Sequence, residues 1–586
     1  MYAIVIRTLP QTNPHLYSYP SLLFTEVFFE RSGYWQVLSI SRKNYLRKET
    51  DGNPSQKGGV VMKNIIKIIL IITFTVILCS NSSFAQTEEP QYGGSLVVAH
   101  PLTPPHLDTD KTTDSNVGVI MFHVFEGLFE VDQSYRPIPH LAESYSQNED
   151  GSFYEFTLRK GVSFHDGTEM TAEDAYASFR RYLQNNGAGR NIAPYVKEIQ
   201  ITGTHSFSVA FHEPYAPFLY FLASPVANQK FVIKPKSLIE KYGDGTMTEF
   251  IGTGPFSFVS WVSDQYIKLK RFDGYQAVTG DSFGYSGRKE VYVDELIFRI
   301  VTEQSVRVAG VTTGEYSFAD AAPRDQLPIF QRNNRIQTYI VSPYRQAFII
   351  VNMGNPPFDN NYARQALLHA LDLEELGLIV VGDPEFWFLN PSLFPPGHIW
   401  HVPHAGAGAY NHFDIAAANA LLSQSDYTGE PIIILNSRED DIESKSAIVL
   451  KNQLERVGFN VDVRLYDRAT VVEQRARPDG YHLHLSQFFS PDPDPQVYGA
   501  WMGTNKWIGQ WDDEHSRYMD GVFEKMLRET DYETRYAIVE SWHDAFYEYV
   551  PYVKLYDYKQ LRIAHERLKG YSNFAFPTFF NVWLEK

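Results

Sequence analysis

The sequence predicts an α/β protein with at least two lobes. The chain has 586 residues and a mass of 67.2 kDa, and a single hydrophobic core stops growing well below that size. Strand-like and helix-like patterns alternate along the chain. Hydrophobic residues make up 44% and charged residues 21% of it, which is the composition of a folded protein and not of a disordered one.

The clearest unit runs from residue 430 to residue 466. Pro431 to Leu435 predicts a buried strand, and Ser444 to Val457 predicts a helix that Gly458 ends. Residues 459–465 then alternate between apolar and polar side chains, as a strand does. A strand, a helix and a strand with short connections predict a crossover between two parallel strands.

Other elements have similar local signals. Apolar or alternating runs predict strands at Ser95–His100 and Phe153–Leu158. Thr171 is a candidate N-cap for a helix that reaches Leu183, with Asp174 near its positive end. A later helix is expected from the cap at Asp531 to Pro551, with these residues on its apolar face: Tyr536, Val539, Trp542 and Phe546.

An export signal is predicted at Met62–Ala85. Lys63 and Lys67 precede an apolar run at Ile68–Leu78, and small residues lead up to a cleavage point after Ala85. A helix of that run would cover about 16 Å, too little for a ~30 Å hydrocarbon core. An export signal stands at the start of a chain, so residues 1–61 are interpreted as an upstream extension translated from a wrong start, with a real extra domain as the alternative.

The signal itself leaves two alternatives open. It could be an ordinary buried helix, although it has no amphipathic stripe. Cys79 could be a lipidation site, but Leu78 precedes it, where such sites need a small residue. Cys79 is the single cysteine of the chain, so the exported part would contain no disulfide, which suits a periplasmic protein.

The net charge and the aromatic content reduce the number of functions that the protein could have. A net charge of −17 disfavours binding to nucleic acid or to an anionic membrane surface. Aromatic residues make up 15% of the chain, which would suit a cavity lined with rings.

Sequence motifs of catalysis are not found. The chain has no nucleophile elbow, phosphate-binding loop, zinc-protease helix or dinucleotide-binding turn. Acidic pairs occur at Asp440-Asp441 and Asp512-Asp513. A glycosidase-type pair remains a minor alternative to solvated surface residues.

Histidines raise the question of a metal. His398, His401, His404 and His412 fall within fifteen residues, and imidazoles can bind Ni²⁺, Cu²⁺ or Zn²⁺. Their spacing matches no closed metal site, so no metal is predicted, with His401 and His404 as weak candidates. His482 and His484, two apart on a strand, are interpreted mainly as structural imidazoles.

The acidic turn Ser490–Pro495 follows a predicted strand at Leu483–Phe489. Loops at the carboxyl ends of parallel strands are where open α/β sheets bind ligands. Three prolines would fix Asp492 and Asp494 in place, and the alternative is a stiff exposed turn.

Several separated segments carry a further signal when they are taken together. They are Tyr92–Leu96, Val124–Leu128, Pro139–Thr171, Gly252–Trp261 with Ile267–Arg271, Asn352–Leu371 and Pro395–Gly397. In sequence and in order they resemble a known family, the extracytoplasmic solute-binding proteins of peptide-type ABC importers, which also include nickel, glutathione and haem binders. The resemblance is to family 5, whose members include dipeptide- and oligopeptide-binding proteins.

The resemblance implies a two-lobed periplasmic-binding-protein fold of class II with an inserted subdomain. Two chain crossings, near residues 300 and 547, would form the hinge. The implied parts are a first lobe of 91–135, 225–300 and 548–586, a subdomain of 136–224 inserted in it, and a second lobe of 301–547.

One departure from the family concerns the ligand. Where peptide binders have an Asp for the ligand's α-ammonium, the ungapped match falls on Pro491, with Asp492 one residue later. Either Asp492 takes that role after a local shift, or the ligand has no free ammonium. Arg438 lies near the family's carboxylate-binding position, and Phe488, Phe489 and Trp501 are candidates for the pocket wall.

The sequence therefore predicts a periplasmic substrate-binding subunit of an ABC importer for a peptide or peptide-like ligand. Its partners would be the membrane permease and ATPase subunits; no cofactor is expected, and the protein would be a monomer. A nickel-chelate or other non-peptide binder of the same family is the first alternative. An exported hydrolase and a ligand-sensing partner of a receptor are the others.

Overall fold

The computed structural model describes residues 89–112, 114–477, 479–489, 492–498 and 512–586, together with three strands near the N-terminus. The chain divides into two compact units, Met1–Glu89 and Pro90–Lys586, which are described separately. The first contains a sheet of antiparallel neighbours in the order β1 (Ile4–Thr8), β2 (Thr25–Arg31), β3 (Tyr34–Ile40). The predicted export signal at 62–85 lies outside the described residues, as does Trp501.

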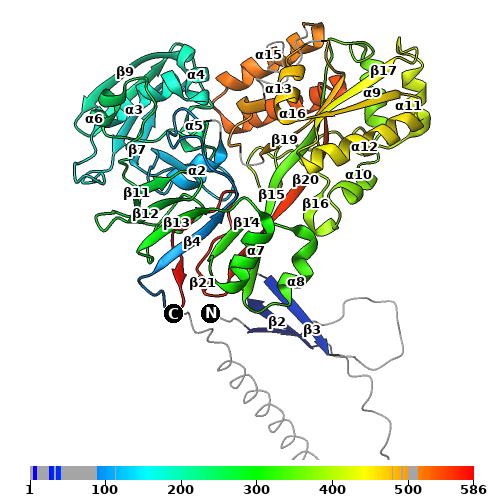
Figure 1. Cartoon of the computed structure of the whole chain (residues 1–586). Coiled ribbons are helices and arrows are strands. Elements are labelled where there is room, and N and C mark those ends of the chain that lie inside the picture. Colours follow the sequence, from blue (N-terminus) through cyan, green and yellow to red (C-terminus); the bar gives the residue numbers. More distant parts are fainter. Residues whose placement is uncertain are drawn as a thin grey trace, which may run out of the picture. The chain divides into compact units, whose positions relative to one another are not determined.

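A long mixed sheet runs through the second unit (Figure 1). Both β13 and β14 are parallel to β4, and both β18 and β19 are parallel to β17. The short strand β16 (Trp387–Phe388) pairs with β20. The strand order is β11 (Phe256–Val262), β12 (Tyr266–Arg271), β13 (Glu295–Ile300), β4 (Ser95–His100), β14 (Phe318–Ala322), β20 (Tyr552–His565), β15 (Ile336–Val351), β19 (Leu483–Phe489), β17 (Pro431–Ser437), β18 (Asn460–Tyr466).

The predicted crossover unit is confirmed. β17 and β18 are parallel in register, from Pro431 opposite Asn460 to Ser437 opposite Tyr466. The helix between them is α12 (Asp441–Arg456), and Gly458 has the positive φ of 93° that the end of the helix requires. The parallel sheet thus brings the carboxyl ends of β17 and β19 to one edge, where ligand sites form in open α/β sheets.

Two long strands connect the lobes. β15 has 16 residues and β20 has 14, and they pair antiparallel from Ile336–His565 to Ile350–Tyr552. In Figure 1 they run between the two lobes. Below, the first lobe denotes residues 90–322 and 566–586, and the second lobe denotes residues 352–551.

The lobe boundaries predicted from the sequence stay predictions. One strand differs from them: β14 pairs with β4 and β20, so residues 318–322 extend the first lobe's half of the sheet, whereas the prediction placed them in the second lobe. The reason is the parallel pairing of Phe318 and Ala319 with Val98 and Ala99.

A separate antiparallel sheet lies within the predicted inserted subdomain. Its order is β7 (Ala142–Gln147), β8 (Phe153–Leu158), β10 (Ser206–Phe211), β9 (Val196–Gly203). The predicted helix after Thr171 is α3 (Ala172–Asn185), and Thr171 and Asp174 form a capping box. Nearby helices are α4 (Gly187–Ile192), α5 (Phe218–Ala223) and α6 (Lys236–Tyr242).

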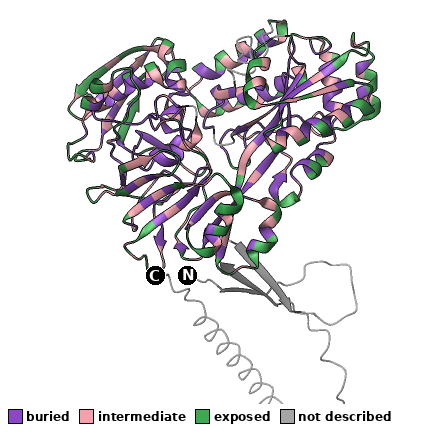
Figure 2. Ribbon diagram, in the orientation of Figure 1, coloured by how far each residue is buried: buried purple, intermediate pink, exposed green. Residues whose placement is uncertain are grey.

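Buried residues occur along the sheets and helices of both lobes (Figure 2). Buried apolar side chains form one cluster in the first lobe and two on the second-lobe side, of which one also includes first-lobe residues such as Val311 and Ala319. The predicted helix after Asp531 is α16, whose buried face includes Val539, Trp542 and Phe546. Further elements are α2 (Ser115–Met121), β5 (Phe129–Val131), β6 (Pro137–Pro139), α7 (Gln304–Thr313), α8 (Leu327–Gln331), α9 (Asn361–His369), α10 (Leu373–Val380), α11 (Ile415–Leu422), α13 (Arg468–Arg475), α15 (Glu514–Arg528), α16 (Tyr532–Tyr549), β21 (Leu568–Lys569) and β22 (Trp583–Leu584).

A buried ion cluster fixes α3 to the rest of the first lobe. Arg181 on α3 donates from Nε to Asp110 at 2.8 Å and from Nη2 to Asp108 at 2.7 Å, and its side chain is 2% exposed. Lys234 also contacts Asp110, at 2.5 Å. A buried charge must keep its partner, because an isolated one loses its hydration without compensation.

This cluster gives a stability prediction. Arg181→Met should destabilise the protein by about 3–5 kcal/mol, because Asp108 would stay buried without its cation. Arg180→Met, on the same helix but exposed, is the matched control and should change stability little. Chemical denaturation of the protein and of its two variants measures both effects. Equal effects of the two substitutions would contradict the argument.

Candidate ligand site between the lobes

The acidic turn after β19 lies at the contact between the lobes. Asp492 is 4% exposed and Asp494 is fully buried. The alternative interpretation of this segment as an exposed turn is therefore wrong. The turn follows the carboxyl end of a strand that is parallel to β17, as the sequence predicted.

Asp492 reaches across to the first lobe. Its Oδ1 accepts a hydrogen bond from Nε2 of Gln229 at 2.8 Å. No cation of the described residues pairs with it, and burial raises its pKa to about 7 while the Gln229 hydrogen bond opposes the rise. The site thus holds a buried carboxyl group whose negative form is compensated by a single amide.

His398 positions the backbone of Asp492. The N–H of Trp400 donates to Nδ1 of His398 at 3.1 Å, so the ring proton sits on Nε2, which donates to the carbonyl of Asp492 at 3.1 Å. Burial lowers the pKa of His398 to about 3, so the imidazole is neutral. The opposite lobe supplies Tyr135, whose ring stacks on His398 at 4.8 Å.

Asp494 pairs with a side chain of the protein itself, whereas a ligand-binding carboxylate would be open to the solute. Arg535 of α16 holds both carboxylate oxygens, at 2.7 Å and 2.8 Å, and the N–H of Gln496 donates to Oδ1 at 2.9 Å. Asp494 thus caps a backbone N–H of its own turn, and the sequence did not identify its ion pair with Arg535. Because the pair is fully buried, Asp494 shapes the turn and presents no carboxylate oxygen to the cleft.

Further contacts close the rim of the cleft. Tyr215 of the first lobe donates to Oε1 of Gln496 at 2.6 Å, and the N–H of Ile399 donates to the carbonyl of Ser134 at 3.1 Å. At the surface, Arg528 pairs with Glu213 at 3.1 Å. Amides and rings, rather than buried charges, therefore make most of the contact.

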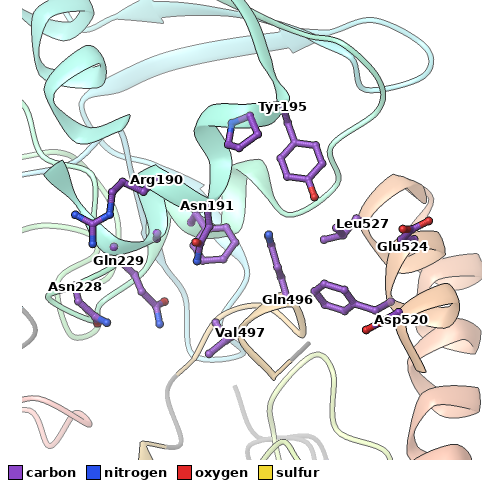
Figure 3. A pocket seen from close by; sticks show the side chains of 15 residues that line it. Arg190, Asn191, Tyr195, Asn228, Gln229, Gln496, Val497, Asp520, Glu524 and Leu527 are labelled. Carbon is purple, nitrogen blue, oxygen red and sulfur yellow. The ribbon is translucent and has the colours of Figure 1, made fainter. Parts of the chain in front are cut away.

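A pocket of about 650 Å³ opens beside this contact. Figure 3 shows it between the first-lobe segment that carries Tyr195 and the helix that carries Asp520 and Glu524, which is α15. Gln229 and Gln496 both line it, so it borders the amide that bonds Asp492. Its size is in the range of small-molecule sites.

The remaining predicted residues have mixed outcomes. Phe488 is buried and packs on Phe348 at 5.2 Å between ring centres, within a buried cluster of the second lobe, and its role in the pocket wall stays a prediction. Arg438 is exposed at the end of β17, where its N–H donates to Tyr466 at 2.9 Å. The side chain of Phe489 and all of Trp501 lie outside the described residues, so their pocket roles stay predictions.

The histidines have separate partners. Nδ1 of His401 donates to the carbonyl of Phe394 at 2.9 Å, while His404 contacts Glu540 at 3.3 Å. Within the described residues no group of three His, Cys, Asp or Glu side chains is arranged to hold a metal ion. The weak metal candidates His401 and His404 therefore gain no support.

Other polar motifs from the sequence are structural. The carbonyl of Leu435 accepts from Nδ1 of the buried His484 at 2.7 Å, and the N–H of Ile433 donates to Nδ1 of His482 at 3.0 Å. These imidazoles join β19 to β17, as the main interpretation held. In the acidic pairs, Asp440 caps α12 and Asp513 caps α15, which explains the pairs as helix starts.

Sequence reasoning missed four residues of the site. Gln229, Tyr135, Tyr215 and Gln496 lie on loops or short segments without a periodic pattern. Tyr135 alone has a local signal in the structure, a positive φ of 64°. His398 was noticed, but for metal binding. Contacts between lobes join residues up to 315 positions apart, which no local pattern can reveal.

Known proteins share this sequence and fold. The sequence profile of the bacterial extracellular solute-binding proteins, family 5, matches residues 136–510. The glutathione-binding protein of Salmonella choleraesuis is 26% identical over 383 residues, which are 64% of this chain and 70% of that protein. A probable peptide ABC transporter periplasmic-binding protein of Sinorhizobium fredii is 25% identical over 449 residues, 74% of this chain and 82% of that one.

A solved structure agrees at the level of the fold. The oligopeptide-binding protein of Bacillus subtilis in complex with a nonapeptide superimposes with a TM-score of 0.68 at 21% identity, covering 85% of this chain and all of the other. The chain belongs to family 5 of the bacterial extracellular solute-binding proteins. It is a two-lobed binding protein and not an enzyme, which rejects the exported hydrolase. Among the described residues, no helix is both long and apolar enough to span a bilayer.

The ion pair beneath the turn gives the second prediction. Asp494→Asn should destabilise the protein by about 3–5 kcal/mol, because Arg535 would remain buried beside a neutral amide. Glu213→Gln removes one partner of the exposed Arg528 pair and should cost less than about 1 kcal/mol. Denaturation midpoints compare the two. A mild Asp494→Asn would show that the pair does not hold the turn.

Proposed function

We propose that the protein is the periplasmic substrate-binding subunit of an ABC importer and takes up a peptide or peptide-like solute. The solute would bind between the lobes, and the loaded protein would deliver it to the membrane permease, which works with ATPase subunits. The family, a relative in peptide ABC transport and the likeness to a peptide-bound structure support this role. We also propose that it acts as a monomer.

The buried carboxyl group of Asp492 is the observation that supports the peptide class most directly. A buried carboxylate is stable when a cation compensates it, and within the described residues none does. The α-ammonium of a peptide supplies such a cation. Asp492 would then replace, one residue later, the family aspartate whose place Pro491 occupies.

A nickel chelate or another non-peptide solute remains the second candidate. This candidate would be favoured if the ligand carries no cation. Asp492 would then bind the ligand as a neutral carboxylic acid, which its raised pKa allows. The described histidines add no support for direct metal binding. The two candidates therefore differ in the charge that Asp492 meets.

Binding measurements test whether the protein binds a peptide or peptide-like solute. The protein from residue 86 onward is purified from native cells, and any bound solute is identified by mass spectrometry. A library of di- to hexapeptides, amino acids, sugars and metal chelates is then screened by thermal shift, since a ligand at a hundredfold excess over Kd stabilises the folded state by about 2.7 kcal/mol. A library without any stabilising compound would count heavily against the proposal.

Asp492→Asn decides the class of ligand. For a ligand with an ammonium group it should weaken binding by about 2–5 kcal/mol, because the cation is left buried and unpaired. Asp479→Asn, at an exposed position before β19, is the matched control and should leave calorimetric affinity unchanged. An Asp492→Asn affinity within about threefold of wild type would reject the ammonium site and favour the second candidate.

We propose that Met62–Ala85 directs export and is cleaved, so that the mature protein starts at Gln86. The support is the sequence pattern of a positive start, an apolar run and small residues. N-terminal sequencing of the exported protein should therefore begin at Gln86. Residues of 1–61 on that protein would refute the interpretation of the start, and a lipid on Cys79 would replace cleavage after Ala85.

A further inference from the structure

A second pocket lies at the hinge, away from the acidic turn. It has a volume of about 630 Å³, and its walls come from both lobes and from the strands between them. Gln304 and Ala322 line it from the first lobe, and Val381 and Lys445 line it from the second lobe. Arg324 and Lys559 line it from the segments between the lobes. We call it the hinge pocket.

The hinge pocket and the site of Asp492 have no lining residue in common. Tyr558 and Leu561 of β20 line the pocket and share one buried cluster with Val380 and Val381. Asp492 instead contacts Gln229 and His398, and neither of these residues lines the hinge pocket. A ligand in the hinge pocket would therefore not occupy the site of Asp492.

Two cations line the hinge pocket without an ionic partner. The guanidinium of Arg324 lies 5.9 Å from the ring centre of Tyr558, and Nζ of Lys559 lies 5.7 Å from that of Phe388. Neither forms an ion pair with a carboxylate of the described residues. Contacts with rings orient a cation but leave its charge uncompensated.

The other charges of the pocket leave an excess of positive charge. Lys445 is paired with Asp441 at 2.6 Å, and Asp325 is exposed at the rim. In addition, α7 begins at Gln304 in the pocket wall, and no side chain caps its first turn. The positive end of the α7 dipole thus adds to Arg324 and Lys559.

We propose that the hinge pocket binds a small free oxyanion through its carboxylate or phosphate group. Arg324 and Lys559 supply the charge, and Arg324 supplies the planar pair of donors that such groups accept. Because the walls belong to both lobes, a bound oxyanion joins them at the hinge and changes the angle at which they rest.

Titration with inorganic phosphate and with citrate tests this site on the mature chain. Each should raise the unfolding temperature in a saturable way at constant ionic strength, and Arg324→Gln/Lys559→Gln should weaken the binding by roughly tenfold or more. Arg332→Gln/Lys270→Gln removes the same charge at exposed positions outside the pocket and should bind as wild type does. Melting in chloride alone shows whether the variants are folded.

Asp492→Asn separates the two sites. It should leave the effect of phosphate and citrate unchanged, because neither Asp492 nor its partners Gln229 and His398 line the hinge pocket. Loss of the effect in Asp492→Asn, an equal loss in the charge-matched control, or no saturable stabilisation of the wild type by either anion would overturn the proposal. Small-angle scattering with and without phosphate should show a change in the separation of the lobes, and an unchanged profile at saturation would reject the effect on lobe angle.

Discussion

The antiparallel pairing of β15 with β20 is the constraint on which both lobes depend. The two strands share one ladder from Ile336 to Ile350, and β14 and β19 extend it into opposite halves of the sheet. Each half of the sheet therefore depends on β15 and β20 for its backbone pairing. A pair of strands bends and twists more easily than it breaks, so the lobes can change their angle while the hydrogen bonds of the ladder persist. The acidic turn and the hinge pocket both lie next to this pair.

Much of the fold could be predicted from the sequence, because its signals are local. Alternation and caps identified β17, α12, β18, α3 and α16 to within a few residues. The same local signals placed Asp492 and Asp494 after a parallel strand. They could not show that Asp494 faces Arg535, 41 residues away on another element. They also could not show that Phe488 packs on Phe348, since a buried aromatic residue has the same sequence pattern in a core as in a pocket wall.

There is a different reason why the contact between the lobes could not be predicted from the sequence. Its members, such as Gln229 with Asp492 and Tyr215 with Gln496, are separated by more than 260 residues, and each is an ordinary polar residue of a loop. Their meeting depends on the relative placement of two lobes, which follows from the whole strand ladder. The resemblance to a family supplied the location of the cleft, and the structure supplies these partners.

The composition of this contact has a consequence for affinity. Its amides and hydroxyl groups exchange protein partners for water when the lobes separate, and such exchanges are nearly balanced in free energy. For these neutral groups the open and contacting forms therefore differ by little. The carboxyl group of Asp492 is the exception, because contact between the lobes buries it without a cation and its hydration favours the open form. A solute that brings a positive charge removes this cost, so the preference of the empty protein for the open form would itself select for such a solute.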